Sequence, residues 1–528
     1  MLALELVVVL GTAIVLGGVL AHRLRVAAPV VLLLIGVLLG FVPALRAVHL
    51  PSELMLLVFL PVLLYWEAIT SSLREIRANL RGIVLSSTLL VVCTAAAVAA
   101  VAHRLGVPWG PAWVLGAALA PTDATAVSAL SRLLPRRNLA VLRAESLVND
   151  GTALVLYGVA VGVTVGEESL GAGHLGRLLV LSYLGGALAG AAVAWLGTQV
   201  RRRLDDPLLG NVVTLLTPFL AFLVAEAVEA SGVLAVVVSG LVAGQVGPRT
   251  VSAGTRRQAE AFWSLGTFLL NGSLFVLVGL EVQSAVRGLS SADLTTALAA
   301  VVTVWLTVLV VRMAFLVVSA YTIRLLDRRP SQRLRRVSNR ARVVSTVAGF
   351  RGAVSLAAAL AVPTTLSSGA PFPDRDLVVF VTAGVVALTL VVQGVLLPPT
   401  VRWAAFPQDT APADERALAD RFAAEQALEA MPGLAADLGV RDEVVAGLRE
   451  EYEDRLQVLR AAGEDDGEPV VRQSEQVRDL RRALIARKRA AVLQLRDERR
   501  IDDGVLRQVQ ARLDVEELRL SGDDLALE

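Results

Sequence analysis

Long apolar stretches separated by short polar loops fill the first three quarters of the chain. Each stretch is roughly 17–25 residues long, which is the length of helix that crosses ~30 Å of hydrocarbon. Thirteen stretches can be drawn, over residues 2–20, 29–45, 51–70, 82–102, 110–131, 138–165, 175–198, 210–229, 231–246, 260–280, 294–323, 341–362 and 377–400. The first is treated as a span rather than a signal peptide, because it carries Glu5 and has no basic leader. The pattern predicts an all-α polytopic membrane protein with about 13 transmembrane helices.

Arginines alternate between the loops that join these stretches. If the first loop is cytoplasmic, cytoplasmic loops hold 22 arginines and the opposite loops hold five. Because Lys and Arg collect in cytoplasmic loops, the N-terminus is expected outside and the C-terminal part in the cytoplasm. This parity depends most on the short pair of stretches over 210–246.

Composition separates the chain into two parts. Of its 528 residues, 55% are hydrophobic, and the mean hydropathy is +0.64. The formal net charge of +2 conceals +12 over residues 1–406 and −10 over residues 407–528. We therefore expect a transmembrane domain over 1–406 and a cytoplasmic, charged, helical tail over 407–528. Lys488 is the single lysine against 49 arginines, which is typical of a GC-rich bacterial genome and favours the inner membrane.

The same composition excludes several classes of protein. Cys93 is the only cysteine and lies in an apolar run, so a secreted disulfide protein is excluded. The basic residues follow membrane topology, which argues against a nucleic-acid binder; the expected surroundings are membrane lipid. No phosphate-binding loop, metal-ligand cluster or nucleophile triad is recognisable, so we expect neither an enzyme nor a cofactor.

Ionisable side chains inside the bilayer are costly and mark candidate sites. Ser146, Asn149 and Asp150 fall at i, i+3 and i+4 and share one face of a helix. Their hydroxyl, amide and carboxylate oxygens suit small hard cations. The alternative is a polar patch that joins neighbouring helices. A carboxylate in mid-span is too costly for that role alone, so the pattern favours an ion site.

Two stretches are interrupted by residues that break helices. Pro121 interrupts the fifth, beside Thr122 and Asp123, and Gly349–Gly352 interrupts the twelfth around Arg351. Broken spans in corresponding places of two halves mark the binding site of transporters built from inverted repeats. Six-helix units over spans 1–6 and 8–13 place each break in the fifth position of its unit. These features together predict an ion-coupled secondary transporter.

Three motifs are similar to those of the NhaP/NHE-type monovalent cation:proton antiporters. They are Ala-Pro-Thr-Asp at 120–123, Glu-Ser-Leu-Val-Asn-Asp at 145–150 and Gly-Phe-Arg-Gly-Ala-Val-Ser at 349–355. The resemblance extends over nearly the whole membrane part. It implies a dimeric protein with a dimerisation domain and a six-helix core that contains two crossed, partly unwound helices.

The resemblance also implies roles for individual residues. Asp150 binds either a proton or the cation, and Na⁺ is held by Asp150, Glu67, Ser146 and Thr122. Asn149 orients Asp150, while Asp123 organises the helix crossing. Glu145 forms a structural ion pair, for which Arg312 is the preferred partner and Arg351 the alternative.

The expected activity is exchange of Na⁺ or Li⁺ for H⁺ by alternating access, with a role in pH homeostasis. Relatives with two adjacent aspartates are electrogenic, so Asn149 in the first position suggests electroneutral exchange. A K⁺/H⁺ antiporter with the same site remains an alternative, as does a non-transporting membrane receptor that signals through its tail.

The tail has apolar residues at helical spacing and two aromatic residues, Phe422 and Tyr452. Its basic segment Arg478–Arg489 suits anionic headgroups, although an ordinary solvated helical face is the favoured explanation of this segment. We expect a helical domain that regulates or dimerises the transporter, through a bound regulator or through headgroups.

Overall fold

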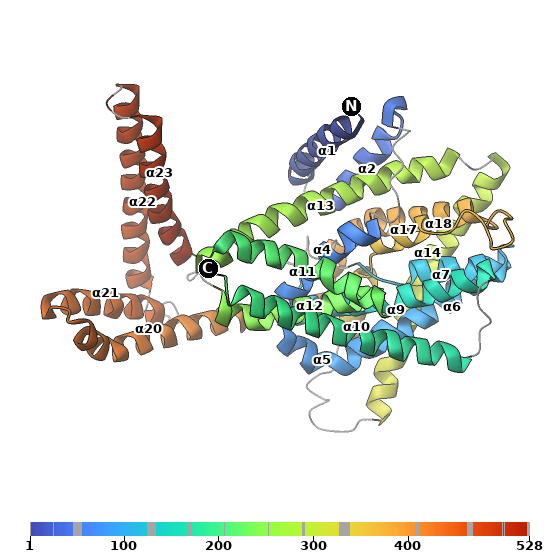
Figure 1. The fold of residues 1–528 in the computed structure, drawn as a ribbon, viewed down its shortest axis with the longest axis horizontal. Coiled ribbons are helices and arrows are strands. Elements are labelled where there is room, and N and C mark those ends of the chain that lie inside the picture. The colour runs from blue at the N-terminus through green and yellow to red at the C-terminus, as the bar shows by residue number, and fades with distance from the viewer. Residues whose placement is uncertain are drawn as a thin grey trace. The chain divides into compact units, whose positions relative to one another are not determined.

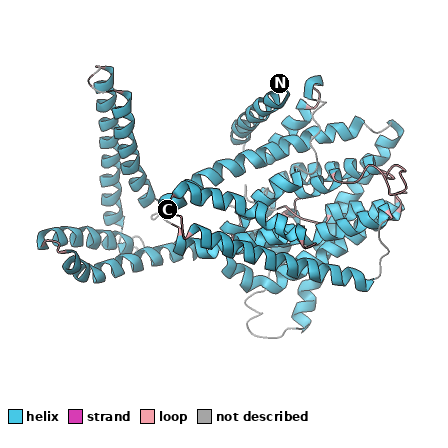
Figure 2. Ribbon diagram, in the orientation of Figure 1, coloured by secondary structure: helices cyan, strands magenta, loops and turns pink. Residues whose placement is uncertain are grey.

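The computed structural model describes residues 2–24, 26–45, 55–123, 134–166, 172–204, 206–251, 253–287, 291–326, 338–406, 411–461, 468–498, 500 and 502–524. Over these ranges the chain is almost entirely helical, and the only β feature is a bridge between Thr365 and Pro371 (Figure 2). The chain divides into two compact units, Met1–Pro407 and Gln408–Glu528.

The helices of the first unit, in chain order, are α1 (Leu2–Leu24), α2 (Ala28–Leu39), α4 (Leu60–Thr70), α5 (Leu73–Leu85), α6 (Val91–Arg104), α7 (Trp109–Leu119), α9 (Arg136–Val165), α10 (Ala172–Arg201), α11 (Pro207–Ala227), α12 (Gly232–Thr250), α13 (Ala253–Arg287), α14 (Ser291–Leu326), α16 (Asn339–Val347), α17 (Ala353–Leu360), α18 (Arg375–Leu388) and α19 (Gly394–Ala404) (Figure 1). A 3₁₀ turn, η1, spans Pro43–Leu45, and three π-helical turns precede or join helices: η2 (Met55–Phe59), η3 (Ser86–Leu90) and η5 (Thr389–Gln393).

All thirteen stretches predicted from the sequence contain helix in this unit. Eight helical segments of the described chain are long and apolar enough to cross a membrane, and three shorter apolar helices accompany them. The first unit is therefore a polytopic helical membrane domain.

Side chains at the surface of this unit are strongly apolar, as lipid contact requires. α10 exposes Leu184 and Leu188, and α14 exposes Val310. Inside, helices approach closely through small residues. At the crossing of α2 and α13, Gly36 and Gly279 face each other so tightly that a side chain on either would collide with the backbone of the other helix.

Local sequence explains where several helices begin and end. Ser231 caps α12 by accepting a hydrogen bond from the Leu234 amide at 3.2 Å, and Ser338 caps α16 in the same way. α9 follows Pro135 and ends at Gly166, which adopts a left-handed conformation with φ 96°. This 30-residue helix carries the 145–150 motif through the centre of the unit.

The second unit consists of α20 (Ala411–Leu438), α21 (Asp442–Ala461), α22 (Glu468–Asp497) and α23 (Asp503–Asp524). The helices pack as two pairs, α20 with α21 and α22 with α23 (Figure 1). Its small core includes Ile485, Leu513 and Leu520, while many other apolar side chains are exposed. Among the described residues, this tail has few buried aliphatic contacts.

Candidate functional site

Two interrupted helices meet at the centre of the membrane unit. α7 ends at Leu119, and Pro121 begins a non-helical segment in which Thr122 is buried. The second interruption separates α16 from α17. The backbone amide of Asp123 donates a hydrogen bond to the carbonyl of Phe350 at 2.9 Å, so the two breaks are joined directly.

Arg351 lies at the ends of both interrupted helices and is only 1% exposed. Its Nε donates to the carbonyl of Leu119 at 3.1 Å, and its Nη1 donates to the carbonyl of Gly349 at 2.6 Å. The C-terminal end of a helix carries partial negative charge that a cation stabilises. Arg351 therefore neutralises the exposed carbonyls that the two breaks create.

Asp123 occupies the opposite kind of helix end. Gly352 directly precedes α17, and a β-carbon on Gly352 would collide with the Asp123 carboxylate. The carboxylate thus lies against the N-terminus of α17, where partial positive charge favours an anion. The glycine is required here because no side chain fits between the two broken segments.

α9 presents its polar motif to the first break. The side-chain amide of Asn149 donates to the hydroxyl of Thr122 at 2.7 Å. Ser146, Asn149 and Asp150 are all at most 4% exposed. Oδ1 of Asp150 and Oδ1 of Asn149 are buried and accept no hydrogen bond from the described residues. Buried oxygens without donors are suited to a proton or a cation.

Glu67 lies on α4, and its Oε1 is likewise buried without a hydrogen-bond donor. Asp150 interacts electrostatically with both Asp123 and Glu67. Like charges in a buried site repel one another, and a bound proton or cation removes that repulsion. The structure thus brings together Thr122, Asn149, Asp150 and Glu67 from three separate elements.

Glu145 begins the motif on α9 but points to a different partner. Its Oε1 accepts a hydrogen bond from Arg312 Nη1 at 2.5 Å, and their side chains are 5% and 2% exposed. Arg312 Nε also donates to the carbonyl of Ser345 at 2.9 Å. Arg351 instead binds the helix-end carbonyls. The ion pair therefore joins α9, α14 and α16 beside the site.

Sequence reasoning missed the hydroxyl groups that support the site. Thr389, in the π-helical turn η5, accepts a hydrogen bond from the backbone amide of Arg351 at 3.2 Å. The Thr152 hydroxyl is hydrogen-bonded to Ser87 in η3 and to Tyr183 on α10. Thr152 shares a face of α9 with Glu145 and Asn149, so helical spacing could have identified it, whereas the residues of η5 and α10 carried no such signal.

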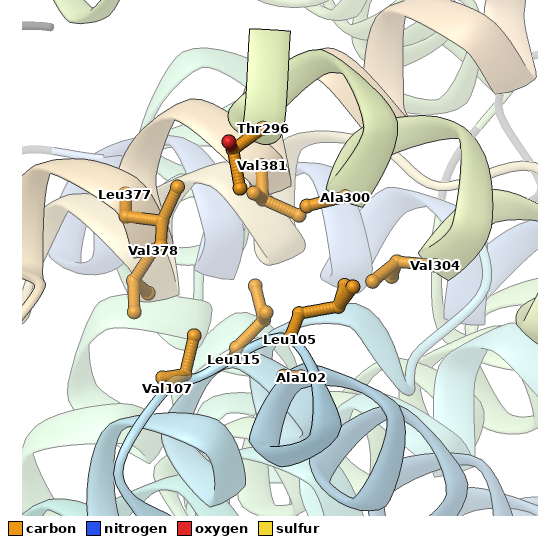
Figure 3. Close-up of a pocket in the computed structure, with 10 residues that line it drawn as sticks. All are labelled: Ala102, Leu105, Val107, Leu115, Thr296, Ala300, Val304, Leu377, Val378 and Val381. Carbon is orange, nitrogen blue, oxygen red and sulfur yellow. The ribbon is translucent and has the colours of Figure 1, made fainter. Parts of the chain in front are cut away.

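A small cavity elsewhere in the unit is almost wholly apolar (Figure 3). It lies between α6, α7, α14 and α18, and Thr296 supplies its single hydroxyl. With no charged lining residue, it does not fit an ion site. Among the described residues, no three His, Cys, Asp or Glu side chains are grouped to hold a metal ion. The candidate cation ligands therefore combine carboxylates with hydroxyl and amide groups.

Comparison with known proteins identifies the family of this chain. The family model described as "Sodium/hydrogen exchanger, transmembrane" matches residues 10–403. An uncharacterised Na⁺/H⁺ exchanger of Mycobacterium tuberculosis is 47% identical over 520 residues, which cover 98% of this chain and 96% of that protein. A sodium, potassium, lithium and rubidium/H⁺ antiporter of Bacillus pumilus is 30% identical over 71% of this chain and 57% of its own length.

A solved structure shows the same fold. The sodium/proton antiporter MjNhaP1 of Methanocaldococcus jannaschii superposes with a TM-score of 0.56 at 19% identity, covering 77% of this chain and 100% of the neighbour. The family consists of cation/proton antiporters, which are transporters rather than enzymes. The chain belongs to the transmembrane sodium/hydrogen exchanger family.

Proposed function

We propose that this protein exchanges Na⁺ or Li⁺ for H⁺ across the cytoplasmic membrane, with Asp150 binding either the cation or the proton. The observation that carries the proposal is the buried Oδ1 of Asp150, which has no described hydrogen-bond donor and lies among other carboxylates beside two joined helix breaks. Glu67, Ser146 and Thr122 complete the set of cation ligands. Asn149, whose side-chain amide donates a hydrogen bond to the Thr122 hydroxyl, orients Asp150.

Asn149 precedes Asp150, so the site carries one motif carboxylate instead of two. A single carboxylate that holds either ion is neutral in both loaded forms, which supports one-for-one, electroneutral exchange. Alternating access then moves the neutral site past the barrier. The structural ion pair Glu145–Arg312 and the helix-end charges of Arg351 and Asp123 hold the surroundings fixed.

K⁺/H⁺ exchange by the same residues is the second candidate. It is supported by the Bacillus relatives, whose names include potassium and rubidium beside sodium and lithium. The cation is exchanged through the same carboxylate in either case. Transport of the cation requires Asp150, whereas signalling as a receptor would not.

The proposal includes the wider organisation. The membrane unit forms thirteen spans with inverted repeats and associates as a homodimer in the inner membrane, with the N-terminus outside. The tail is a cytoplasmic regulatory module that takes a regulator or anionic headgroups. The arginine alternation between loops supports this orientation, and no cofactor is required.

Exchange in proteoliposomes tests the assignment. Proton flux is measured under Na⁺, K⁺ and Li⁺ gradients, with and without an imposed voltage. Asp150→Asn is expected to abolish exchange while the protein remains folded, because a neutral amide cannot alternate between proton and cation. The control is Glu226→Gln, which neutralises an exposed carboxylate near the end of α11. Cation-dependent flux in Asp150→Asn would overturn the proposal, and a voltage-driven flux would overturn electroneutrality.

A further inference from the structure

The Thr152 hydroxyl on α9 is hydrogen-bonded to residues of two other elements, η3 and α10. Its Oγ1 donates to the backbone carbonyl of Ser87 in η3 at 2.6 Å and is also hydrogen-bonded to the hydroxyl of Tyr183 on α10. Thr152 is 2% exposed. A backbone carbonyl has two lone pairs, so the Ser87 carbonyl can accept this bond within the π-helical turn η3.

The direction of these two bonds follows from the number of protons. A threonine hydroxyl has one proton, and a carbonyl can only accept. Since Thr152 gives its proton to Ser87, the phenol of Tyr183 must donate to Thr152. The series of hydrogen bonds thus runs from Tyr183 through Thr152 to the Ser87 carbonyl. Removal of the Tyr183 hydroxyl breaks its first bond.

The position of Thr152 on α9 allows these hydrogen bonds to affect the orientation of the site. Glu145, Asn149 and Thr152 fall at i, i+4 and i+7 on one face, while Asp150 lies about 160° away from Thr152 around the helix. The Ser87 hydroxyl also donates to the carbonyl of Glu145 at 3.2 Å. Bonds on this face therefore fix the rotation of α9 about its axis, which decides where Asp150 points.

Tyr183 belongs to a firmly anchored helix. The amide of Ser231, at the start of α12, donates to the carbonyl of Ser182 at 3.2 Å. A β-carbon on Gly186 would approach the Ser231 carbonyl to 2.6 Å, so α10 and the start of α12 are in close contact. α10 can therefore serve as a fixed reference against which α9 is oriented.

We propose that Tyr183 is a positioning residue that sets the rotation of α9 through Thr152, and thereby the cation affinity of the site around Asp150. The proposal rests on the exchange function proposed above. Tyr183 touches neither the cation nor the proton in this arrangement, and it acts only through the Thr152 hydroxyl.

The experiment compares Tyr183→Phe with Tyr157→Phe in proteoliposomes. Tyr157 lies on α9 itself, and its buried hydroxyl has no hydrogen-bond partner among the described residues, so it is a matched control. Loss of one hydrogen bond corresponds to roughly a fivefold change in an equilibrium constant. Tyr183→Phe is expected to raise the half-saturating Na⁺ concentration about fivefold, while the maximal rate stays within about twofold. Tyr157→Phe should match the parent protein.

Variants of Thr152 test whether Tyr183 acts through the Thr152 hydroxyl. Thr152→Ser keeps the hydroxyl and should retain the parent affinity, whereas Thr152→Val should weaken it at least as much as Tyr183→Phe. The Na⁺ affinity of the double variant Tyr183→Phe/Thr152→Val should be no lower than that of Thr152→Val, because both changes remove the same Tyr183–Thr152 hydrogen bond. Parent affinity in Tyr183→Phe, or additive losses in the double variant, would overturn the inference. A parent protein that moves no cation would instead contradict the proposed function.

Discussion

The two units of this protein use the same charged side chains in opposite environments. In the membrane unit, the side chains of Glu145 and Arg312 are 5% and 2% exposed. In the tail, Lys488 and Glu516 form an ion pair at 2.8 Å with side chains 52% and 48% exposed. The two N–O distances are similar, but the surrounding solvent differs. Removing one partner of a buried pair leaves an uncompensated buried charge, whereas water hydrates the charge that remains when an exposed pair is broken.

The difference also explains how charge is arranged in each unit. Buried charges in the membrane unit are few, and most are matched to an opposite charge, a helix end or the candidate ion site, while Arg342 donates a hydrogen bond to Asn339 and lies over the Tyr321 ring. Arg351 and Asp123, for example, lie at helix ends of opposite polarity. Charges in the tail are numerous and repeat along solvated helices. Position therefore decides the role of a charge in the first unit, and overall density decides it in the second.

Removal of Arg312 is expected to have the largest effect. Arg312→Ala leaves Glu145 buried without its partner, which costs about 3–5 kcal/mol in comparable buried pairs. We expect a strong fall in the yield and melting temperature of the detergent-solubilised protein, measured by fluorescence-detected size exclusion after heating. Arg324→Ala is the control: it changes a half-buried arginine that lies over the Tyr321 ring near the end of the same helix, and should have a much smaller effect.

A second variant separates charge from packing at this position. Arg312→Met combined with Glu145→Gln removes both charges and keeps most of the volume. It should recover much of the stability lost in Arg312→Ala, because no isolated charge remains. Equal melting temperatures for Arg312→Ala and the parent would show that the buried pair is not structurally important.

An intermediate effect is expected at the contact between the two helix breaks. Gly352→Ala places a methyl group where the Asp123 carboxylate lies, so one of the two broken segments must move. Overpacking of this kind costs about 1–3 kcal/mol. We expect a measurable fall in melting temperature and a larger loss of exchange, since the displaced segments carry the candidate ligands.

Gly158→Ala is the control, because a side chain at Gly158 on α9 meets no atom within 4 Å. Alanine also favours a helix more than glycine does. This variant should be as stable as the parent or more so. Parent-level exchange in Gly352→Ala would contradict the close packing of Asp123 against the start of α17.

Sequence patterns predicted most of the local features, such as helices and helix faces. They predicted few of the contacts between segments that are far apart in the sequence. Hydropathy located the helical stretches, because each must cover a length of hydrocarbon with apolar side chains. Spacing placed Ser146, Asn149 and Asp150 on α9, and Pro121 marked the end of α7. The contact of Asp123 with Phe350 depends on residues 227 positions apart, and no periodicity encodes it.

The same limit applies to the supporting hydroxyl groups. Thr152 could have been chosen from its helix face, but its partners on η3 and α10 are set by how three helices pack. Ser86-Ser87-Thr88 was a visible polar interruption in an apolar stretch, and it corresponds to the π-helical turn η3. The pairing of Glu145 with Arg312 rather than Arg351 likewise depends on tertiary structure, since both arginines lie in predicted spans.

The smallest effect is expected from the exposed pairs of the tail. The hydrogen bonds that Arg489 donates to the carboxylates of Glu517 and Asp514 raise the pKa of Arg489 above its usual range. A basic group with a raised pKa is charged below that value, so Arg489 stays protonated throughout the pH range of a transport assay. Arg489→Ala should therefore leave both the pH profile of exchange and the melting temperature unchanged within error, and high salt should weaken the pair in the parent. A shift in the pH profile would show that this exposed cluster regulates transport.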